Sequence, residues 1–174
     1  MLADAGIVVT ATPADMDEDT IEASDPEALA RARAVAKAHA VHRSGQCTIA
    51  ADQVAHLDGV AFGKPLDPAD HRARLRSLRG RTHTLTTALV VMRENIEVVA
   101  VHSFVSFRAD LSDAEIDVYV HTGEGSGCAG GYRAEGRGAQ LIARVEGDWW
   151  NVIGLPLYDL VSILRAGGWR PIFS

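Results

Sequence analysis

The spacing of apolar and polar residues predicts four helices. Apolar residues recur every three or four positions in each, and a capping residue or a proline marks each start. The clearest start is Ser112-Asp113-Ala114-Glu115, a capping box in which the serine and glutamate side chains cap each other's backbone N–H groups. The predicted helices are residues 25–43, 67–78, 112–121 and 154–165.

Runs of β-branched and apolar residues between turn residues predict the strands. Asp58-Gly59 is a strong signal for a tight hairpin between two of these runs. Residues 139–145 fit either a strand or a helix. Together the elements predict an α/β fold with a mixed β-sheet flanked by helices, as a single domain over residues 1–174. The predicted strands are residues 6–12, 47–56, 60–62, 82–92, 97–108 and 132–134.

Composition and charge narrow the possible function classes. The chain has 174 residues, of which 47% are hydrophobic and 23% charged, as in an ordinary globular protein. Its formal net charge is −6, whereas a protein that binds a nucleic acid polymer usually carries a basic excess. The arginine-rich run 71–81 has helical spacing, so we interpret it as a solvated helix face rather than a basic patch.

Cysteine usage and hydropathy predict a cytoplasmic protein. Cys47 and Cys128 fit no zinc or redox spacing and are expected to be buried free thiols in a reducing compartment. The first residues do not form a signal peptide, and no apolar run is long enough to span a membrane. We therefore expect neither a membrane nor a nucleic acid polymer as a partner.

The predicted hairpin brings a carboxylate and an ammonium together. A two-residue turn places Gln53 opposite Lys64, and a one-residue bulge would place Asp52 there instead. In either register the Asp52 carboxylate lies beside the Lys64 ammonium. Such a pair suits phosphoryl chemistry, because the acid can activate water or hold a metal while the lysine holds phosphate. The alternative is a surface ion pair that contributes about 0–1 kcal/mol.

Other candidates carry less information when taken singly. Residues 15–19 are an acidic cluster that suits Mg²⁺, or simply a solvated turn. Lys37 lies in an alanine-rich helix and either extends along a packed face or points into a cleft. Glu135, in the glycine-rich segment 122–138, can accept from a purine edge or be a surface acid. The histidines show no metal-binding spacing and are interpreted as surface or structural residues.

Several short motifs occur in one order along nearly the whole chain: Asp17-Glu18, Lys37-Ala38, Ala51-Asp52-Gln53-Val54, Asp58-Gly59, Gly63-Lys64-Pro65, Gly80-Arg81-Thr82-His83 with Thr87, Cys128-Ala129-Gly130-Gly131, Ala134-Glu135-Gly136 and Val152-Ile153-Gly154-Leu155-Pro156. In this order they resemble the Maf-like nucleoside triphosphate pyrophosphatases. The resemblance implies two small lobes with a cleft between them. It also implies hydrolysis of the bond between the α- and β-phosphates, with a divalent metal cation, Mg²⁺ or Mn²⁺, as cofactor.

The same resemblance implies roles for individual residues. Asp52 matches the proton acceptor and a metal ligand, and Glu18 matches an acidic residue at the metal. Lys37 and Lys64 match cations that line the phosphate cleft. The expected partner is a nucleoside triphosphate substrate, and a homodimer is left open.

Three positions resemble the 7-methyl-GTP branch of that family. Gln53, Cys128 and Glu135 stand where the dTTP/UTP branch usually has threonine, lysine and glutamine. Gln53 and Glu135 are expected to bind the base, because a carboxylate can pair with the N1–H and 2-amino donors of guanine. The first hypothesis is therefore a 7-methyl-GTP pyrophosphatase.

Two alternatives stay open. One is a dTTP/UTP pyrophosphatase. The other is a catalytically impaired nucleotide-binding regulator of cell division, because the family's Ser-x-Ser-Pro-x-Arg segment would precede Met1 and is not in this sequence.

Overall fold

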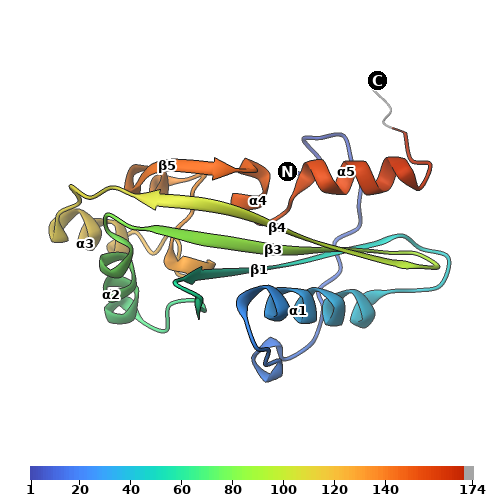
Figure 1. The fold of residues 1–174 in the computed structure, drawn as a ribbon, viewed down its shortest axis with the longest axis horizontal. Coiled ribbons are helices and arrows are strands. Elements are labelled where there is room, and N and C mark those ends of the chain that lie inside the picture. The colour runs from blue at the N-terminus through green and yellow to red at the C-terminus, as the bar shows by residue number, and fades with distance from the viewer. Residues whose placement is uncertain (171–174) are drawn as a thin grey trace.

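A computed structural model describes residues 1–170 of the chain. At its centre is a five-stranded antiparallel sheet with the strand order β2-β1-β3-β4-β5 (Figure 1). The strands are β1 (Thr48–Leu57), β2 (Val60–Phe62), β3 (Thr82–Met92), β4 (Ile96–Phe107) and β5 (Ile142–Gly147). The α-helices are α1 (Pro26–Val41), α2 (Pro68–Leu78), α3 (Asp113–His121), α4 (Trp149–Val152) and α5 (Leu157–Ala166). Short 3-10 turns are η1 (Glu18–Thr20), η2 (Ala129–Gly131) and η3 (Arg137–Leu141).

Helices cover both faces of the sheet at one end. α1 lies along one face and α5 along the other, while α2 and α3 lie at the opposite end (Figure 1). On α1, Ala30, Ala34 and Ala38 are fully buried against the sheet residues Val54 and Val90. Alanines four residues apart form a stripe of small side chains, so the helix can lie close to the sheet.

Strand β3 is buried on both of its faces. Leu89 and Val91 pack on the α5 side, whereas Ala88, Val90 and Met92 pack on the α1 side. Successive strand residues point to opposite faces, so a strand covered on both sides has a continuous apolar sequence. This explains why the pattern at 82–92 predicts the strand with its observed bounds.

The sheet is antiparallel throughout and not mixed, which corrects the sequence prediction. β1–β2 and β3–β4 are hairpins. After β4 the chain returns to the end where β4 finishes, so β5 begins beside it and Ile142 pairs with Phe107. β1 and β3 also pair antiparallel, so each pair of neighbours runs in opposite directions. The predicted helices are confirmed within a few residues at their ends, and residues 139–145 divide between η3 and β5.

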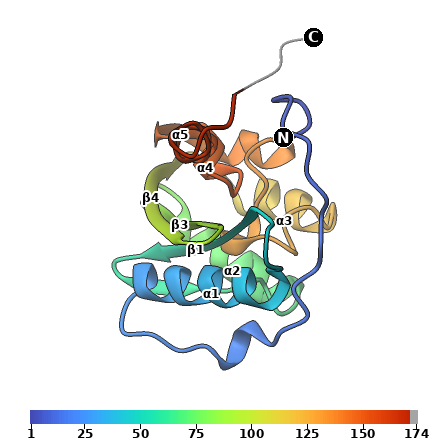
Figure 2. The same cartoon turned by 90° about the vertical axis from the view of Figure 1, so that its right-hand side faces the viewer.

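Two predicted strands are wrong. Residues 6–12 form no strand: Ile7 packs against the α5 cluster, Val8 is 97% exposed, and the segment passes from the α5 side of the sheet to the α1 side (Figure 2). Residues 132–134 also lie in a loop, in which Tyr132 is buried. Both runs have strand-forming side chains, but neither meets a neighbouring strand to pair with.

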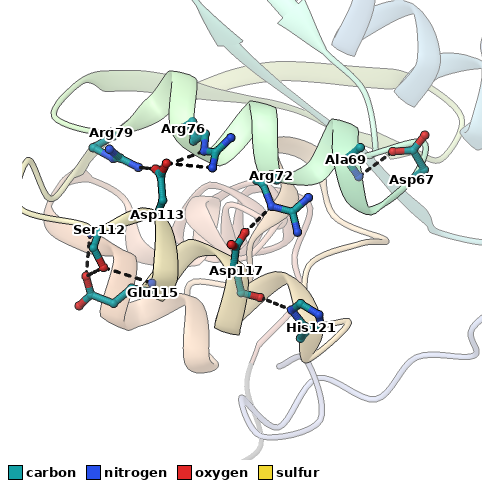
Figure 3. Close-up of polar contacts among 10 residues, drawn as sticks. All are labelled: Asp67, Ala69, Arg72, Arg76, Arg79, Ser112, Asp113, Glu115, Asp117 and His121. Atoms are coloured by element: carbon teal, nitrogen blue, oxygen red, sulfur yellow. Dashed lines mark hydrogen bonds and ion pairs between the residues drawn. The ribbon is translucent and has the colours of Figure 1, made fainter.

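The arginines of α2 form an ionic contact with α3 and are not a purely solvated face. Asp113 accepts from Arg76, at 2.9 Å, and from Arg79, while Arg72 pairs with Asp117 (Figure 3). The hydrogen bond from Arg79 helps to lower the pKa of Asp113. These exposed pairs orient the two helices relative to each other and add little stability singly.

Two further expectations can be compared with the structure. Both cysteines are free, but Cys47 is exposed and Cys128 is half-buried, so the prediction of two buried thiols is wrong.

Within residues 1–170, no helix combines the length and the apolar character that crossing a membrane requires.

Candidate functional site

Three charged residues meet on the α1 face of the sheet. Alternation along β1 puts Asp52 on this face, between Ala50 and Val54. Lys37 of α1 reaches the same place, where its Nζ donates a 2.6 Å hydrogen bond to Asp52 Oδ1. The same ammonium lies 3.0 Å from Glu18 Oε2. The structure thus joins Glu18, Lys37 and Asp52, which we call the acid–lysine cluster.

Burial sets the electrostatics of this cluster. The Asp52 residue is only 7% exposed, and burial raises the pKa of its carboxyl although the hydrogen bond and charge of Lys37 oppose the shift. Burial acts to lower the pKa of Lys37, but hydrogen bonds and charges from Asp52 and Glu18 outweigh it and raise that pKa. Lys37 therefore stays charged, while the raised pKa makes the Asp52 carboxylate a stronger proton acceptor than an ordinary aspartate.

Arg33 belongs to this site although it was not a candidate from the sequence. It lies one helical turn before Lys37, and its Nε donates a 3.1 Å hydrogen bond to the backbone carbonyl of Glu18. Its charge also acts to lower the pKa of Asp52. The available signal was the four-residue spacing of Arg33 and Lys37, because such residues share one face of a helix.

The acid–lysine cluster has a donor set that fits a divalent metal. Glu18 and Asp52 supply carboxylate oxygens, and Mg²⁺ is usually held by one or two carboxylates together with substrate phosphates. Asp52 Oδ2 is buried and has no hydrogen-bond partner in residues 1–170, which leaves one oxygen available. No group of three or more His, Cys, Asp or Glu in these residues is arranged to hold a metal ion. The residues therefore fit a metal that arrives with phosphate ligands.

The predicted pairing of Asp52 with Lys64 is wrong. β2 pairs with β1 only along Ala55–Leu57, and the strand ends at Phe62, before Lys64. Pro65 has no backbone N–H to donate to a longer ladder. Lys64 is therefore exposed in the loop after β2, and Lys37 holds the position beside the carboxylate.

Gln53 lies on the opposite face of the sheet from Asp52. Its Nε2 donates to Thr87 Oγ1 at 3.0 Å and to the backbone oxygen of Asn151 at 2.6 Å. The buried Asn151 side chain donates in turn to Leu85 O and Ser103 Oγ, which fastens α4 to β3 and β4. We call this set of hydrogen bonds the amide network.

A cavity of about 80 Å³ lies beside Gln53 on this face. The glycine-rich loop contributes Cys128, Arg133 and Glu135 to its lining. Glu135 is paired with Arg133 at 3.0 Å, so the predicted base-binding acid shares the cavity with a guanidinium. The cavity is smaller than the roughly 300–1,000 Å³ of common ligand pockets, so a nucleotide would extend out of it.

Buried histidines hold the glycine-rich loop in place. His83 Nε2 is hydrogen-bonded to the Tyr132 hydroxyl at 2.9 Å, and the two rings meet edge to face. His71 donates to the backbone oxygen of Gly131. Burial lowers the pKa of His83 to about 4, which keeps its ring neutral at pH 7. This confirms a structural role for these two histidines.

The open edge of β1 connects the acid–lysine cluster with the amide network and its cavity. Because β2 pairs only with Ala55–Leu57, residues 48–54 of β1 have no strand on their outer side in the described part of the chain. Asp52 and Gln53 are consecutive on this edge, and each is directed to a different face. A ligand along the edge could therefore contact the acid–lysine cluster with one end and the cavity with the other.

A larger hollow of about 720 Å³ lies at the other end of β1. Residues from the segments 42–47 and 93–97 line it. Its lining includes the exposed Cys47 but none of the candidate site residues, so its size alone assigns it no function.

Known proteins are similar in sequence to this chain over most of its length. The family described as "Maf-like protein" matches residues 1–167. The chain belongs to this family. A dTTP/UTP pyrophosphatase of Thermus thermophilus is 45% identical over 146 residues, which cover 84% of this chain and 77% of that relative. Further Maf-like relatives are similar over more of the chain.

A dTTP/UTP pyrophosphatase of Symbiobacterium thermophilum is 38% identical over 176 residues and covers 100% of this chain and 90% of its own length. A dTTP/UTP pyrophosphatase of Myxococcus xanthus is 37% identical over 176 residues, which cover 98% of this chain and 89% of that relative. The Maf-like family assignment is thus confirmed. The assignment to the 7-methyl-GTP branch is not confirmed, because these relatives are dTTP/UTP pyrophosphatases.

Proposed function

We propose that dTTP and UTP are the substrates of this chain, a nucleoside triphosphate pyrophosphatase of the Maf-like family. The named activity of the relatives supports this choice of substrates. The observation that carries the proposed hydrolysis is the acid–lysine cluster, in which a buried Asp52 shares one ammonium with Glu18 beside the open edge of β1. A phosphate chain on this edge would meet both positive charge and a carboxylate able to accept a proton.

In the proposed reaction, water attacks the α-phosphorus of the nucleotide. Asp52 accepts a proton from the water as the new P–O bond forms, and its raised pKa makes it a better acceptor than an ordinary aspartate. The bond from the α-phosphorus to the bridging oxygen breaks, and pyrophosphate leaves with the electron pair. The products are the nucleoside monophosphate and pyrophosphate.

The basic residues have different proposed positions along the phosphate chain. Lys37 lies at Asp52 and offsets charge that develops near the reacting phosphorus. Lys64, exposed on the loop after β2, offsets charge on the phosphates farther out. Glu18 and Asp52 would hold the divalent metal. When bound, that metal neutralises phosphate charge and supplies Lewis-acid polarisation.

A second candidate substrate is 7-methyl-GTP. It is favoured by Glu135 in the lining of the cavity, because a carboxylate can accept from the guanine edge. The ion pair with Arg133 weakens this argument, since the guanidinium already occupies Glu135 Oε1 and supplies donors that suit the carbonyl oxygens of a pyrimidine.

A pyrophosphate-release assay tests the proposal. With Mg²⁺ present, we expect turnover of dTTP and UTP, and in competition we expect 7-methyl-GTP to be the poorer substrate. A reversed preference would favour the second candidate. Nucleotide binding in a calorimeter without pyrophosphate release would contradict catalysis and would favour the regulator hypothesis.

A further inference from the structure

The orientation of the Gln53 side-chain amide is determined by its two acceptors. The backbone oxygen of Asn151 can only accept a hydrogen bond, so the Gln53 atom 2.6 Å away must be the NH₂ group and not the oxygen. The second amide hydrogen is directed to Thr87 Oγ1 at 3.0 Å. Both donors are thus used inside the protein, and Oε1 is the only polar atom of the amide that is left for a ligand.

The surroundings of these acceptors make the orientation rigid. Thr87 is fully buried and pairs directly with Gln53 across β1 and β3. Asn151 is also fully buried, and its side chain is fastened to Leu85 and Ser103 of the neighbouring strands. Turning the amide would leave buried acceptors without a donor and would place two oxygens together, which is costly in a buried site.

We propose that Thr87 is a positioning residue. Together with the backbone oxygen of Asn151 it fixes the Gln53 amide so that Oε1 is left to accept a hydrogen bond, and the cavity therefore takes a base with a ring N–H donor. This rests on the proposed function, in which the base lies in the cavity beside Gln53. Uracil and thymine have an N–H at ring position 3, whereas cytosine has an acceptor there. Arg133, which also lines the cavity, supplies donors for the carbonyl oxygens that flank this N–H.

The test compares UTP with CTP, which differ on this edge of the ring. The wild-type protein should prefer UTP in kcat/KM, and calorimetry should show tighter binding of UMP than of CMP. Thr87→Val keeps the shape of the side chain and removes the acceptor. We expect it to reduce the UTP-to-CTP preference about tenfold, the size of one hydrogen bond, mainly through KM. Its kcat with UTP should stay within about twofold, because Asp52 lies on the other face of the sheet.

Matched variants separate positioning from packing. Thr87→Ser restores the hydroxyl and should restore the preference, whereas a purely structural effect of Thr87→Val would not be reversed in this way. Gln53→Met should lose the preference as well, and adding Thr87→Val to it should cause no further loss. If Thr87→Val melts early, the Thr87→Ser and Gln53→Met results still decide the question.

The possible results distinguish this inference from the proposed function. Equal binding of UMP and CMP by the wild type, or a preference that survives in Thr87→Val, would overturn the positioning role even if UTP is hydrolysed. Absence of pyrophosphate release from either nucleotide would contradict the proposed function, while tighter binding of UMP that depends on Thr87 would still support the inference.

Discussion

The acid–lysine cluster and the amide network differ in kind although Asp52 and Gln53 are neighbours in the sequence. The first consists of ionisable groups, and burial together with the neighbouring charges shifts the pKa values of its members Asp52 and Lys37. The second consists of neutral groups whose hydrogen bonds are fixed by geometry. Groups that change protonation suit chemistry, whereas neutral groups in a fixed orientation suit recognition. The alternation of one strand is enough to separate the two tasks onto opposite faces.

Removing the ionisable acid should give the largest effect. Asp52→Asn keeps the shape of the side chain but cannot accept a proton, so we expect the turnover of UTP to fall at least about 100-fold while the melting temperature changes little. Asp58→Asn is a matched control, because Asp58 is exposed at the turn that follows the same strand and pairs only with Arg81 in the described residues. Full turnover by Asp52→Asn would remove the distinction between the two faces.

The loop on the cavity side should show a pH dependence of its own. The pKa of buried His83 is lowered from 6.5 to about 4, so the unfolded chain takes up a proton before the folded one does. Stability from this residue is therefore complete above pH 6.5 and is lost as the pH falls through 4, by about 3 kcal/mol. Unfolding in urea at several pH values measures it.

His83→Gln is the variant that checks this prediction. It should be less stable at pH 7 but should lose less stability between pH 6.5 and 4. His39→Gln, at an exposed position on α1, should follow the wild type. An unchanged pH dependence in His83→Gln would show that another group carries the effect.

Removing the lysine should affect both the chemistry and the stability of the first region. In Lys37→Met the buried Asp52 carboxylate loses its partner, so we expect about 1–3 kcal/mol lower stability at pH 7. The pKa of Asp52 should rise further in this variant. Because the reaction needs the deprotonated carboxylate, the activity of the variant should fall at a higher pH than that of the wild type as the solution is acidified. The acid side of the pH–rate profile of kcat/KM measures this shift.

Lys37→Arg keeps the charge and should shift that profile less than Lys37→Met does. If both variants shift it equally, the contact with Asp52 depends on the shape of the lysine and not on its charge.

The smallest effect is expected at Arg33. Arg33→Gln removes the hydrogen bond that ties η1 to α1, so Glu18 should be less well placed and the KM for the nucleotide–Mg²⁺ complex should rise about 2–10-fold with little change in kcat. Arg31→Gln on the same helix, whose side chain contacts Glu27 and Val98 instead, should leave KM unchanged. A loss of kcat in Arg33→Gln would assign it a direct role in the reaction.

Most elements of the fold follow from local sequence. The helix after Asp25 has a strong cap and the strand at 82–92 is a run of β-branched and apolar residues, and the structure confirms both. The runs at 6–12 and 132–134 have the same local character but form no strand. Local propensity cannot show whether a neighbouring strand is present, and only pairing makes a strand.

The sequence by itself determined the family and the identity of the chemical groups, because short motifs with a fixed order and charge can be recognised without knowledge of the fold. Only the tertiary structure decided which groups meet. Lys37 comes from a helix and Glu18 from a turn before it, and both reach Asp52 from outside the β1–β2 hairpin. Such contacts depend on how α1 packs against the sheet, which is a sum of many buried contacts and not a property of any single motif.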